Sequence, residues 1–409
     1  LKTFSLILIL LGALGIGYGF LTAPKDIQEV ETMLSAESHH EEGSNANAHE
    51  THEVEGNTAV AAEKHKEHLE HVLHHLQNKP WAAFYVACIF FMLISLGVLV
   101  FYAIQQVAQS GWSPLLFRVM QGITAYLPIG SIFFFVFLVL CGLHFNHLFI
   151  WLDPEVVAED KLIANKSGYL NFPFWIIRAA VFLIGWNVYR YFSRKNCLAQ
   201  DEAPDNSFYK KNFNISAMFL VFFIVTESIM SWDWIMSIDV HWFSTLFGWY
   251  TFAGMWCSTM VILVMTTLYL KKQGYLEKVN DSHIHDLGKW TFATSFLWSY
   301  LWFSQFMLIW YANIGEEVTY YVMRIENFKF LYFAMFIINF AFPMLILMSR
   351  DAKRNAGILT FVGLIILSGH WLDVYIMVSA GSLGANAKIG ALEVGMAMMA
   401  AGIFIAVIL

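Results

Sequence analysis

The segment SGHWLDVYIM, residues 368–377, places an imidazole and a carboxylate inside a strongly apolar stretch. His370 and Asp373 are three residues apart and therefore share one face of a helix. Ionisable side chains inside a membrane helix are costly unless they are paired, hydrated or used. An imidazole and a carboxylate can accept a hydroxyl proton and relay it. The pair is a candidate for a proton pathway or a quinone-head site; the alternative is a structural pair that fixes helix packing.

Further ionisable residues in or next to apolar segments are candidates for the same proton path or quinone site: Arg178, Glu227, Asp233, His144 and His147. Each has a structural alternative, because Arg178 can pair with Glu227 or Asp233, and the two histidines can be hydrated anchors at the membrane interface. Another group is expected in loops or at the interface: Asp153, Asp239, His241, Glu316 and Glu317. No residue is predicted to be catalytic, and no fixed set of metal ligands is found.

The composition predicts an all-α polytopic membrane protein. The 409 residues are 58% hydrophobic and 13% charged, with a mean hydropathy of +0.56, whereas soluble domains average about 25% charged residues. Most of the acid excess behind the net charge of −7 lies in one polar stretch, so no nucleic-acid partner is expected. The four cysteines are scattered and form no haem-attachment or iron–sulfur spacing, so no covalently bound cofactor is expected.

Ten transmembrane helices of about 20 mainly apolar residues are expected. Their ranges are 3–22, 81–108, 122–146, 172–193, 213–236, 245–271, 288–313, 327–349, 356–379 and 390–409. The first segment is interpreted as a span rather than a signal peptide, because its apolar run exceeds the usual length of about 15 residues and lacks an A-x-A site. With both termini in the cytoplasm, inside segments hold 14 of the 24 Lys and Arg residues.

Residues 24–80 form the one sizeable polar insert, which this orientation places on the outer side. The insert is acidic and is expected to be largely disordered, with a short amphipathic helix before Pro80. Nine of the 15 histidines lie between His39 and His75. A solvated docking segment is preferred over a metal site, although histidine-rich tracts can bind metal.

Two stretches suggest an internal duplication. NFPFWIIRAAVFLIGWNVYRYFSR (171–194) and NFKFLYFAMFIINFAFPMLILMSR (327–350) share both ends without a gap, and SWDWIMS (231–237) echoes WLDVYIMV (371–378). Two repeated four-helix bundles are expected at 81–243 and 244–380, flanked by helices at 1–23 and 381–409. An even number of spans per repeat gives both halves the same membrane orientation.

The ionisable groups of the spans lie mainly in the outer half of the membrane. This asymmetry favours a proton pathway or a quinone-head site that opens outward. An independent ion or solute transporter would favour broken helices and polar groups that reach both faces, which the cytoplasmic half does not offer. The histidines form no ladder of facing pairs, so bound haem is not expected. A purely structural membrane anchor stays open.

Three motifs resemble the polysulfide-reductase-type (NrfD-like) membrane subunits of alternative complex III, a bacterial quinol:cytochrome c or quinol:oxidase oxidoreductase. They are TESIMSWDWIMSIDVHWFSTLFGWYTFAG (226–254), WSYLWFSQFMLIWYANIGEEVTYY (298–321) and NFAFPMLILMSRDAKR (339–354), and they look like the smaller of the two such subunits. The resemblance covers roughly residues 81–409.

The resemblance implies a place in the bacterial inner membrane, with the insert in the periplasm. It implies the following partners: a sister NrfD-like subunit, an iron–sulfur subunit, multihaem and monohaem cytochromes c, small membrane anchors and a terminal oxidase. Haems and iron–sulfur clusters belong to those partners, which leaves menaquinone or ubiquinone and lipids as ligands of this chain. Quinone contact, proton movement and assembly are the roles that it implies, and no quinone motif is matched residue by residue.

Overall fold

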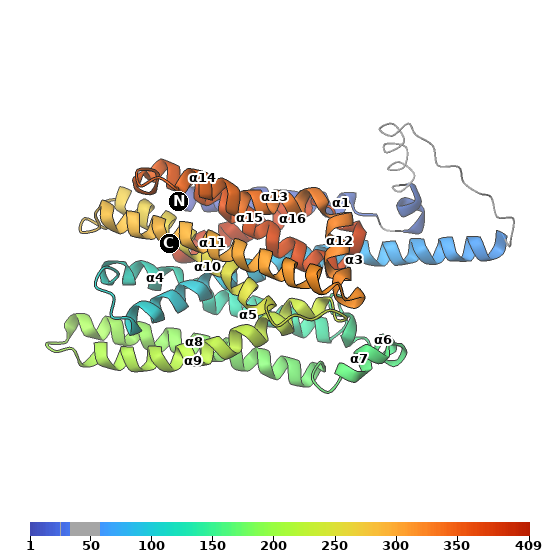
Figure 1. The fold of residues 1–409 in the computed structure, drawn as a ribbon, viewed down its shortest axis with the longest axis horizontal. Coiled ribbons are helices and arrows are strands. Elements are labelled where there is room, and N and C mark those ends of the chain that lie inside the picture. Colours follow the sequence, from blue (N-terminus) through green and yellow to red (C-terminus); the bar gives the residue numbers. More distant parts are fainter. Residues whose placement is uncertain (25, 33–57) are drawn as a thin grey trace.

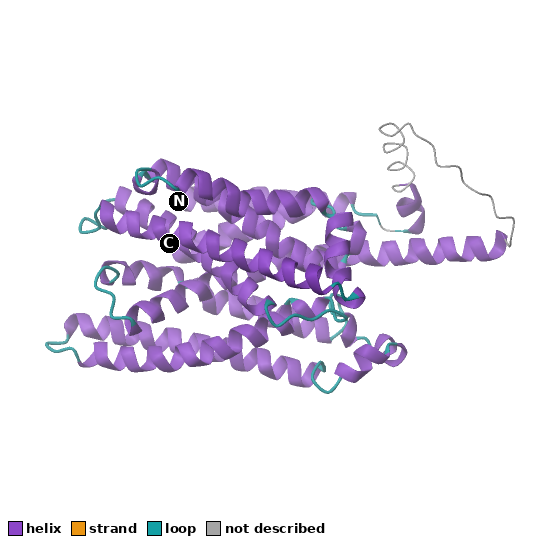
Figure 2. Ribbon diagram, viewed as in Figure 1, coloured by secondary structure: helices purple, strands orange, loops and turns teal. Residues whose placement is uncertain are grey.

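The computed structural model describes residues 1–24, 26–32 and 58–409, and in these ranges every regular element is helical (Figure 2). The long helices run side by side as one elongated bundle (Figure 1). They are α1 (Lys2–Thr22), α3 (Thr58–Val107), α5 (Tyr126–Gly142), α8 (Phe172–Glu202), α9 (Ser207–Trp234), α10 (Phe247–Lys272), α11 (Asp281–Ala312), α15 (Ala356–Ser382) and α16 (Ala391–Ile408). The shorter helices are α4 (Phe117–Ile123), α6 (Pro154–Glu159), α7 (Lys161–Lys166), α12 (Gly315–Asn327), α13 (Lys329–Phe336) and α14 (Phe342–Leu347).

Nine helical stretches of the described residues are long and apolar enough to cross a membrane, so the chain is an integral membrane protein. They coincide with nine of the ten expected spans. The remaining expected span, 288–313, corresponds to α11, which packs beside α10 and α14. Its tryptophan, tyrosine, serine and glutamine residues make it less apolar than the nine. Both termini lie at the same end of the bundle (Figure 1).

Helix α3 is the centre of the bundle. Its apolar window is 94% buried, and the helix contacts α5, α9, α10, α15 and α16. The short amphipathic helix expected before Pro80 and the expected span 81–108 form one continuous helix, which passes through this residue. Side chains on both sides hold this turn in place: Asn78 Oδ1 accepts the backbone N–H of His147 at 3.1 Å, and Lys79 pairs with Glu393 at 3.4 Å.

The insert is ordered at both of its ends. Val30 is fully buried against Leu69 and Val72, so a small apolar contact joins residues 26–32 to the outer part of α3. The rest of the expected disordered segment, 33–57, and most of the histidine-rich tract lie outside the described residues.

Helices α13 and α14 form one crossing that is interrupted by a π-helical turn, Ile337–Ala341. Pro343, at the start of α14, has no N–H to donate, and a π-turn is one way for a helix to accommodate such a missing bond. The turn buries Asn339 completely against Gly369 of α15.

The two flanking helices pack on each other through glycines. A Cβ atom added to Gly12 of α1 would lie 2.6 Å from the backbone N of Met399 in α16, and Ser5 Oγ donates to the Gly402 carbonyl at 2.7 Å. In the rest of the bundle α8 packs on α5 and α9, while α10 packs on α11 and α15. These contacts follow the expected order of helices but do not distinguish two repeated bundles from one, so the duplication stays a prediction.

Candidate functional site

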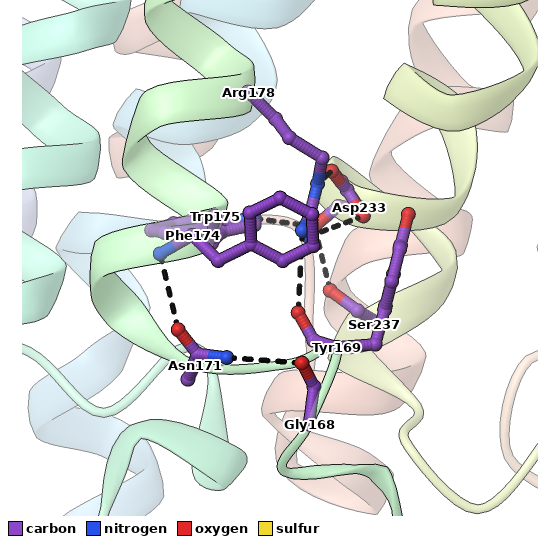
Figure 3. A network of polar contacts seen from close by, with 8 residues as sticks. All are labelled: Gly168, Tyr169, Asn171, Phe174, Trp175, Arg178, Asp233 and Ser237. Carbon is purple, nitrogen blue, oxygen red and sulfur yellow. Dashed lines mark hydrogen bonds and ion pairs between the residues drawn. The ribbon is translucent and has the colours of Figure 1, made fainter.

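Arg178 and Asp233 form a closed ion pair between α8 and α9 (Figure 3). Asn171 caps the start of α8 by accepting the Phe174 N–H at 3.0 Å, which sets Arg178 two turns into the helix. The guanidinium donates to both Asp233 oxygens, at 2.6 and 3.1 Å. Of the two partners expected for Arg178, the structure selects Asp233 rather than Glu227.

The groups around this pair favour a role in holding α8 and α9 together. The Arg178 guanidinium lies over the Tyr169 ring at 4.0 Å and the Phe174 ring at 4.2 Å, and it also donates to the Tyr169 carbonyl at 3.3 Å (Figure 3). Trp175 Nε1 donates to the backbone carbonyl of Asp233 at 3.0 Å. Buried ion pairs are tolerated when further hydrogen bonds satisfy both partners, which is the case here. The geometry supports a structural role for Arg178 and Asp233.

His370 and Asp373 have surroundings that differ from those of the Arg178–Asp233 pair. Both are almost fully buried on one face of α15, with Nδ1 and Oδ2 3.9 Å apart. The Asp373 carboxylate accepts two hydrogen bonds. One comes from the Tyr250 hydroxyl of α10, and the other comes from the Trp298 Nε1–H of α11 at 2.9 Å. Gly254 of α10 lies next to the pair, since a Cβ there would be in ordinary contact with both ionisable side chains, at 3.6 Å. The carboxylate is thus held by two neutral donors, and neither ring nitrogen of His370 has a hydrogen-bond partner among the residues that the structure describes.

Two cavities meet at this pair. Asp373 and Met377 line both of them, and His370 lines the inner one. Only about 20 Å³ of the inner cavity and about 10 Å³ of the outer one can hold the centre of a water-sized sphere. About 10–15 Å³ of such space is needed for one water molecule. Each cavity therefore suits about one water molecule and is too small for a quinone ring.

Arg324 lines the outer cavity from α12 and was not among the expected site residues. It is 2% exposed, and its guanidinium lies 3.3 Å above the Tyr320 ring. Nη1 donates to the Tyr320 carbonyl at 2.8 Å and lies 4.0 Å from Asp239 Oδ2, whose side chain is 27% exposed. The outer cavity therefore reaches from buried Asp373 to a guanidinium beside a carboxylate that contacts solvent.

Three polar atoms of the outer cavity have no hydrogen-bond partner among the described residues. They are Gln305 Oε1, Trp302 Nε1 and Arg324 Nε. Buried polar groups without a protein partner are commonly satisfied by internal water. One acceptor and two donors around one cavity give water the partners it needs to bridge Asp373 and Arg324.

The other expected residues lie elsewhere. Glu227 is buried on α9 with Oε1 unpartnered, lines neither cavity, and has Ser228 Oγ 3.5 Å away. His144 is exposed and has a left-handed backbone, with φ of 59°, just beyond α5. His147 is half-buried next to Asn78. The expected single outward group of polar residues is thus divided between the Arg178–Asp233 pair and the cavity at Asp373.

The outer end of the bundle is tied together by charged residues of the connecting segments. Asp160 caps α7 by accepting the Leu162 and Ile163 N–H groups, and its Oδ2 lies 2.5 Å from His241 Nε2. The hydrogen bond with His241 lowers the pKa of Asp160 below its ordinary value. Lys166 donates to the Val240 carbonyl at 2.5 Å, and burial lowers its pKa. These contacts fix the segment that carries Asp239.

No group of three or more potential metal ligands is found among the described residues. No protein-family model matches the chain, and a search of curated proteins finds no match.

Proposed function

We propose that the chain is an integral membrane subunit of a bacterial respiratory quinol:cytochrome c or quinol:oxidase oxidoreductase, in which it supplies an outward proton pathway. The observation that carries the pathway is the outer cavity, which is lined by buried Asp373 and by Arg324, whose guanidinium lies 4.0 Å from solvent-contacting Asp239. Quinol oxidation releases two electrons and two protons. The electrons go to redox cofactors of partner subunits, and this chain conducts protons toward the outer side.

The route begins at His370 and Asp373, where an imidazole and a carboxylate can exchange a proton across 3.9 Å with a small side-chain movement or one bridging water. Water in the outer cavity continues it past Gln305 and Arg324 to Asp239. The hydrogen bonds to Asp373 come from two neutral donors, Tyr250 and Trp298, so this carboxylate can take up a proton without giving up a guanidinium partner.

The resemblance of residues 81–409 to the NrfD-like subunits supports the membership in such a complex and the partners that it implies. Those are the sister subunit, the iron–sulfur subunit, the cytochromes c, the small anchors and a terminal oxidase. Contact with menaquinone or ubiquinone belongs to the same proposal. The two cavities at Asp373 favour proton conduction as the role of this region.

A structural anchor is the second candidate, favoured by the fully satisfied Arg178–Asp233 pair. The two roles are compatible, since one pair sits between α8 and α9 and the other between α10, α11 and α15.

The first experiment is purification in mild detergent followed by a haem absorption spectrum. Co-purifying cytochromes c support the complex, and their absence overturns it. The second uses proteoliposomes containing the complex and measures protons released outside per electron delivered to cytochrome c.

Asp373→Asn is expected to lower this ratio or the turnover without loss of assembly. Glu227→Gln makes the same change at a buried carboxylate that lines neither cavity, and it is expected to keep both values. Unchanged release and turnover in Asp373→Asn would refute the pathway. Loss of assembly alone would favour the anchor.

A further inference from the structure

A group of basic residues gathers where the short helix Ala352–Arg354 joins α14 to α15 and rests on the start of α11. We name it the basic cluster, and its members are His285, Lys289, Arg350, Lys353 and Arg354. Gly288 makes the contact possible, because a Cβ there would lie 3.0 Å from the Lys353 carbonyl and 3.1 Å from its Cβ. His285 and Lys289 flank Gly288 at a spacing that shares one helix face.

The positive charges of the basic cluster are only partly compensated. Lys353 is 8% exposed and caps the end of α14 by donating to the carbonyls of Leu347 and Met348, at 2.7 and 3.0 Å. Lys289 is paired with Asp286 at 2.7 Å. All four cations lie close enough to the His285 imidazole to oppose a positive charge on it. The cluster therefore has a net positive field.

Arg350 and Arg354 are the two cations of the basic cluster that can bind an anion. Both are exposed, and neither has an acidic partner within 4.0 Å in the part of the chain that the structure describes. Two of the other cations at the same end of the bundle are paired, Arg118 with Asp201 and Lys271 with Asp281. Two guanidinium groups are thus available for an anion from outside the chain.

An apolar strip adjoins the cluster. Leu345 of α14 and Met348, which directly follows this helix, are 73% and 58% exposed, and Phe361 of α15 is 59% exposed. In an integral membrane protein these side chains face lipid acyl chains. A cationic end next to an apolar strip is complementary to a molecule with an anionic head and hydrocarbon tails.

We propose that the basic cluster binds the headgroup of an anionic phospholipid, with its phosphodiester on Arg350 and Arg354 and its acyl chains along Leu345, Met348 and Phe361. Arginine suits this ligand because its planar fork binds two phosphate oxygens at once. Basic pockets between membrane helices on the cytoplasmic side are typical headgroup sites, and this is the end that the distribution of Lys and Arg predicts to be cytoplasmic. The site is independent of quinol oxidation.

The test is native mass spectrometry of the detergent-purified protein with its partners, after addition of phosphatidylglycerol, phosphatidylcholine or inorganic phosphate. Wild type is expected to retain phosphatidylglycerol over phosphatidylcholine. The double variant Arg350→Gln/Arg354→Gln is expected to bind phosphatidylglycerol at least about tenfold more weakly, since two charge-assisted contacts are lost. The matched control Lys210→Gln/Lys211→Gln removes two cations at the same end of the bundle and is expected to bind as wild type does.

Equal retention in the Arg350/Arg354 variant, equal loss in the control, or equal binding of phosphatidylcholine would overturn the proposal. Displacement of the lipid by inorganic phosphate would also overturn it, because the site would then recognise a free anion. A measurement on wild type guards against a variant that does not fold. Raised salt is expected to release phosphatidylglycerol, since salt screens exposed charges, and salt-independent retention would contradict the charge-based site.

Discussion

Replacing Arg178 by methionine is expected to destabilise the protein strongly. The change leaves the Asp233 carboxylate, which is fully buried, without the guanidinium that donates to both of its oxygens at 2.6 and 3.1 Å. Removing one partner of a buried ion pair costs about 3–5 kcal/mol. The contacts of Arg178 with the Tyr169 and Phe174 rings add about 0.5–2 kcal/mol. We expect a total loss of about 3.5–7 kcal/mol.

The measurement is unfolding of the purified protein in mixed micelles with increasing denaturing detergent, followed by tryptophan fluorescence. The double variant Arg178→Met/Asp233→Leu removes both charges, and buried pairs replaced by apolar residues often lose little stability. Its loss is therefore expected to be smaller than that of Arg178→Met alone. Arg194→Met is the control on the same helix, since Arg194 is exposed, and a change within about 0.5 kcal/mol is expected there.

Two results would refute a structural role for this pair. One is a loss of less than about 1 kcal/mol in Arg178→Met, which is the value of an exposed ion pair. The other is a double variant whose loss equals the sum of the two single losses, because residues that act on each other are not additive.

Two further predictions concern the flanking helices and the outer surface. Gly12→Ala is expected to lower the thermal midpoint of unfolding, because the new Cβ would lie 2.6–2.8 Å from α16 atoms. Gly17 has open space around it, so Gly17→Ala is expected to keep the midpoint or raise it through the better helix propensity of alanine. The opposite order of the two midpoints would contradict the α1–α16 packing. The depressed pKa of Asp160 implies stability that is present above its ordinary pKa of 3.8 and is lost as the pH falls through the lower folded-state pKa. His241→Gln removes the main cause of the lowered Asp160 pKa. The difference in thermal midpoint between this variant and wild type is therefore expected to shrink as the pH falls below about 4. A difference that stays constant as the pH falls would argue against the Asp160–His241 hydrogen bond as the source of that difference.

The spans were predictable because about 20 apolar residues are needed to cross a bilayer whatever the tertiary fold. The partner of Arg178 could also have been chosen from depth alone. Arg178 lies near the outer end of α8 and Asp233 near the outer end of α9, whereas Glu227 lies six residues, or about 9 Å, deeper along α9.

The route from Asp373 to the surface was not predictable in the same way. Tyr250 and Arg324 come from separate helices and line one cavity because α12 lies across the end of the bundle (Figure 1) and Tyr320 stacks on Trp242 at 3.8 Å. Asp239 belongs to a third segment and lies 4.0 Å from Arg324. Sequence spacing places Arg324 in a connecting segment, where most arginines are solvated. Its sequence signal was weak: an aromatic residue four positions earlier in an amphipathic helix.

Asp233 and Asp373 occupy matching positions of the predicted duplication, yet their surroundings differ in kind. Both oxygens of the Asp233 carboxylate accept hydrogen bonds from the Arg178 guanidinium, which stabilises the negative charge of Asp233 and ties α8 to α9. Asp373 binds one hydroxyl and one indole N–H, beside an imidazole 3.9 Å away and two cavities. A carboxylate in the first setting can take up a proton only by giving up its ion pair, whereas one in the second needs only a rearrangement of neutral hydrogen bonds. The same position thus favours helix packing in one half of the chain and proton exchange in the other, and variants at Asp233 and Asp373 should separate these roles.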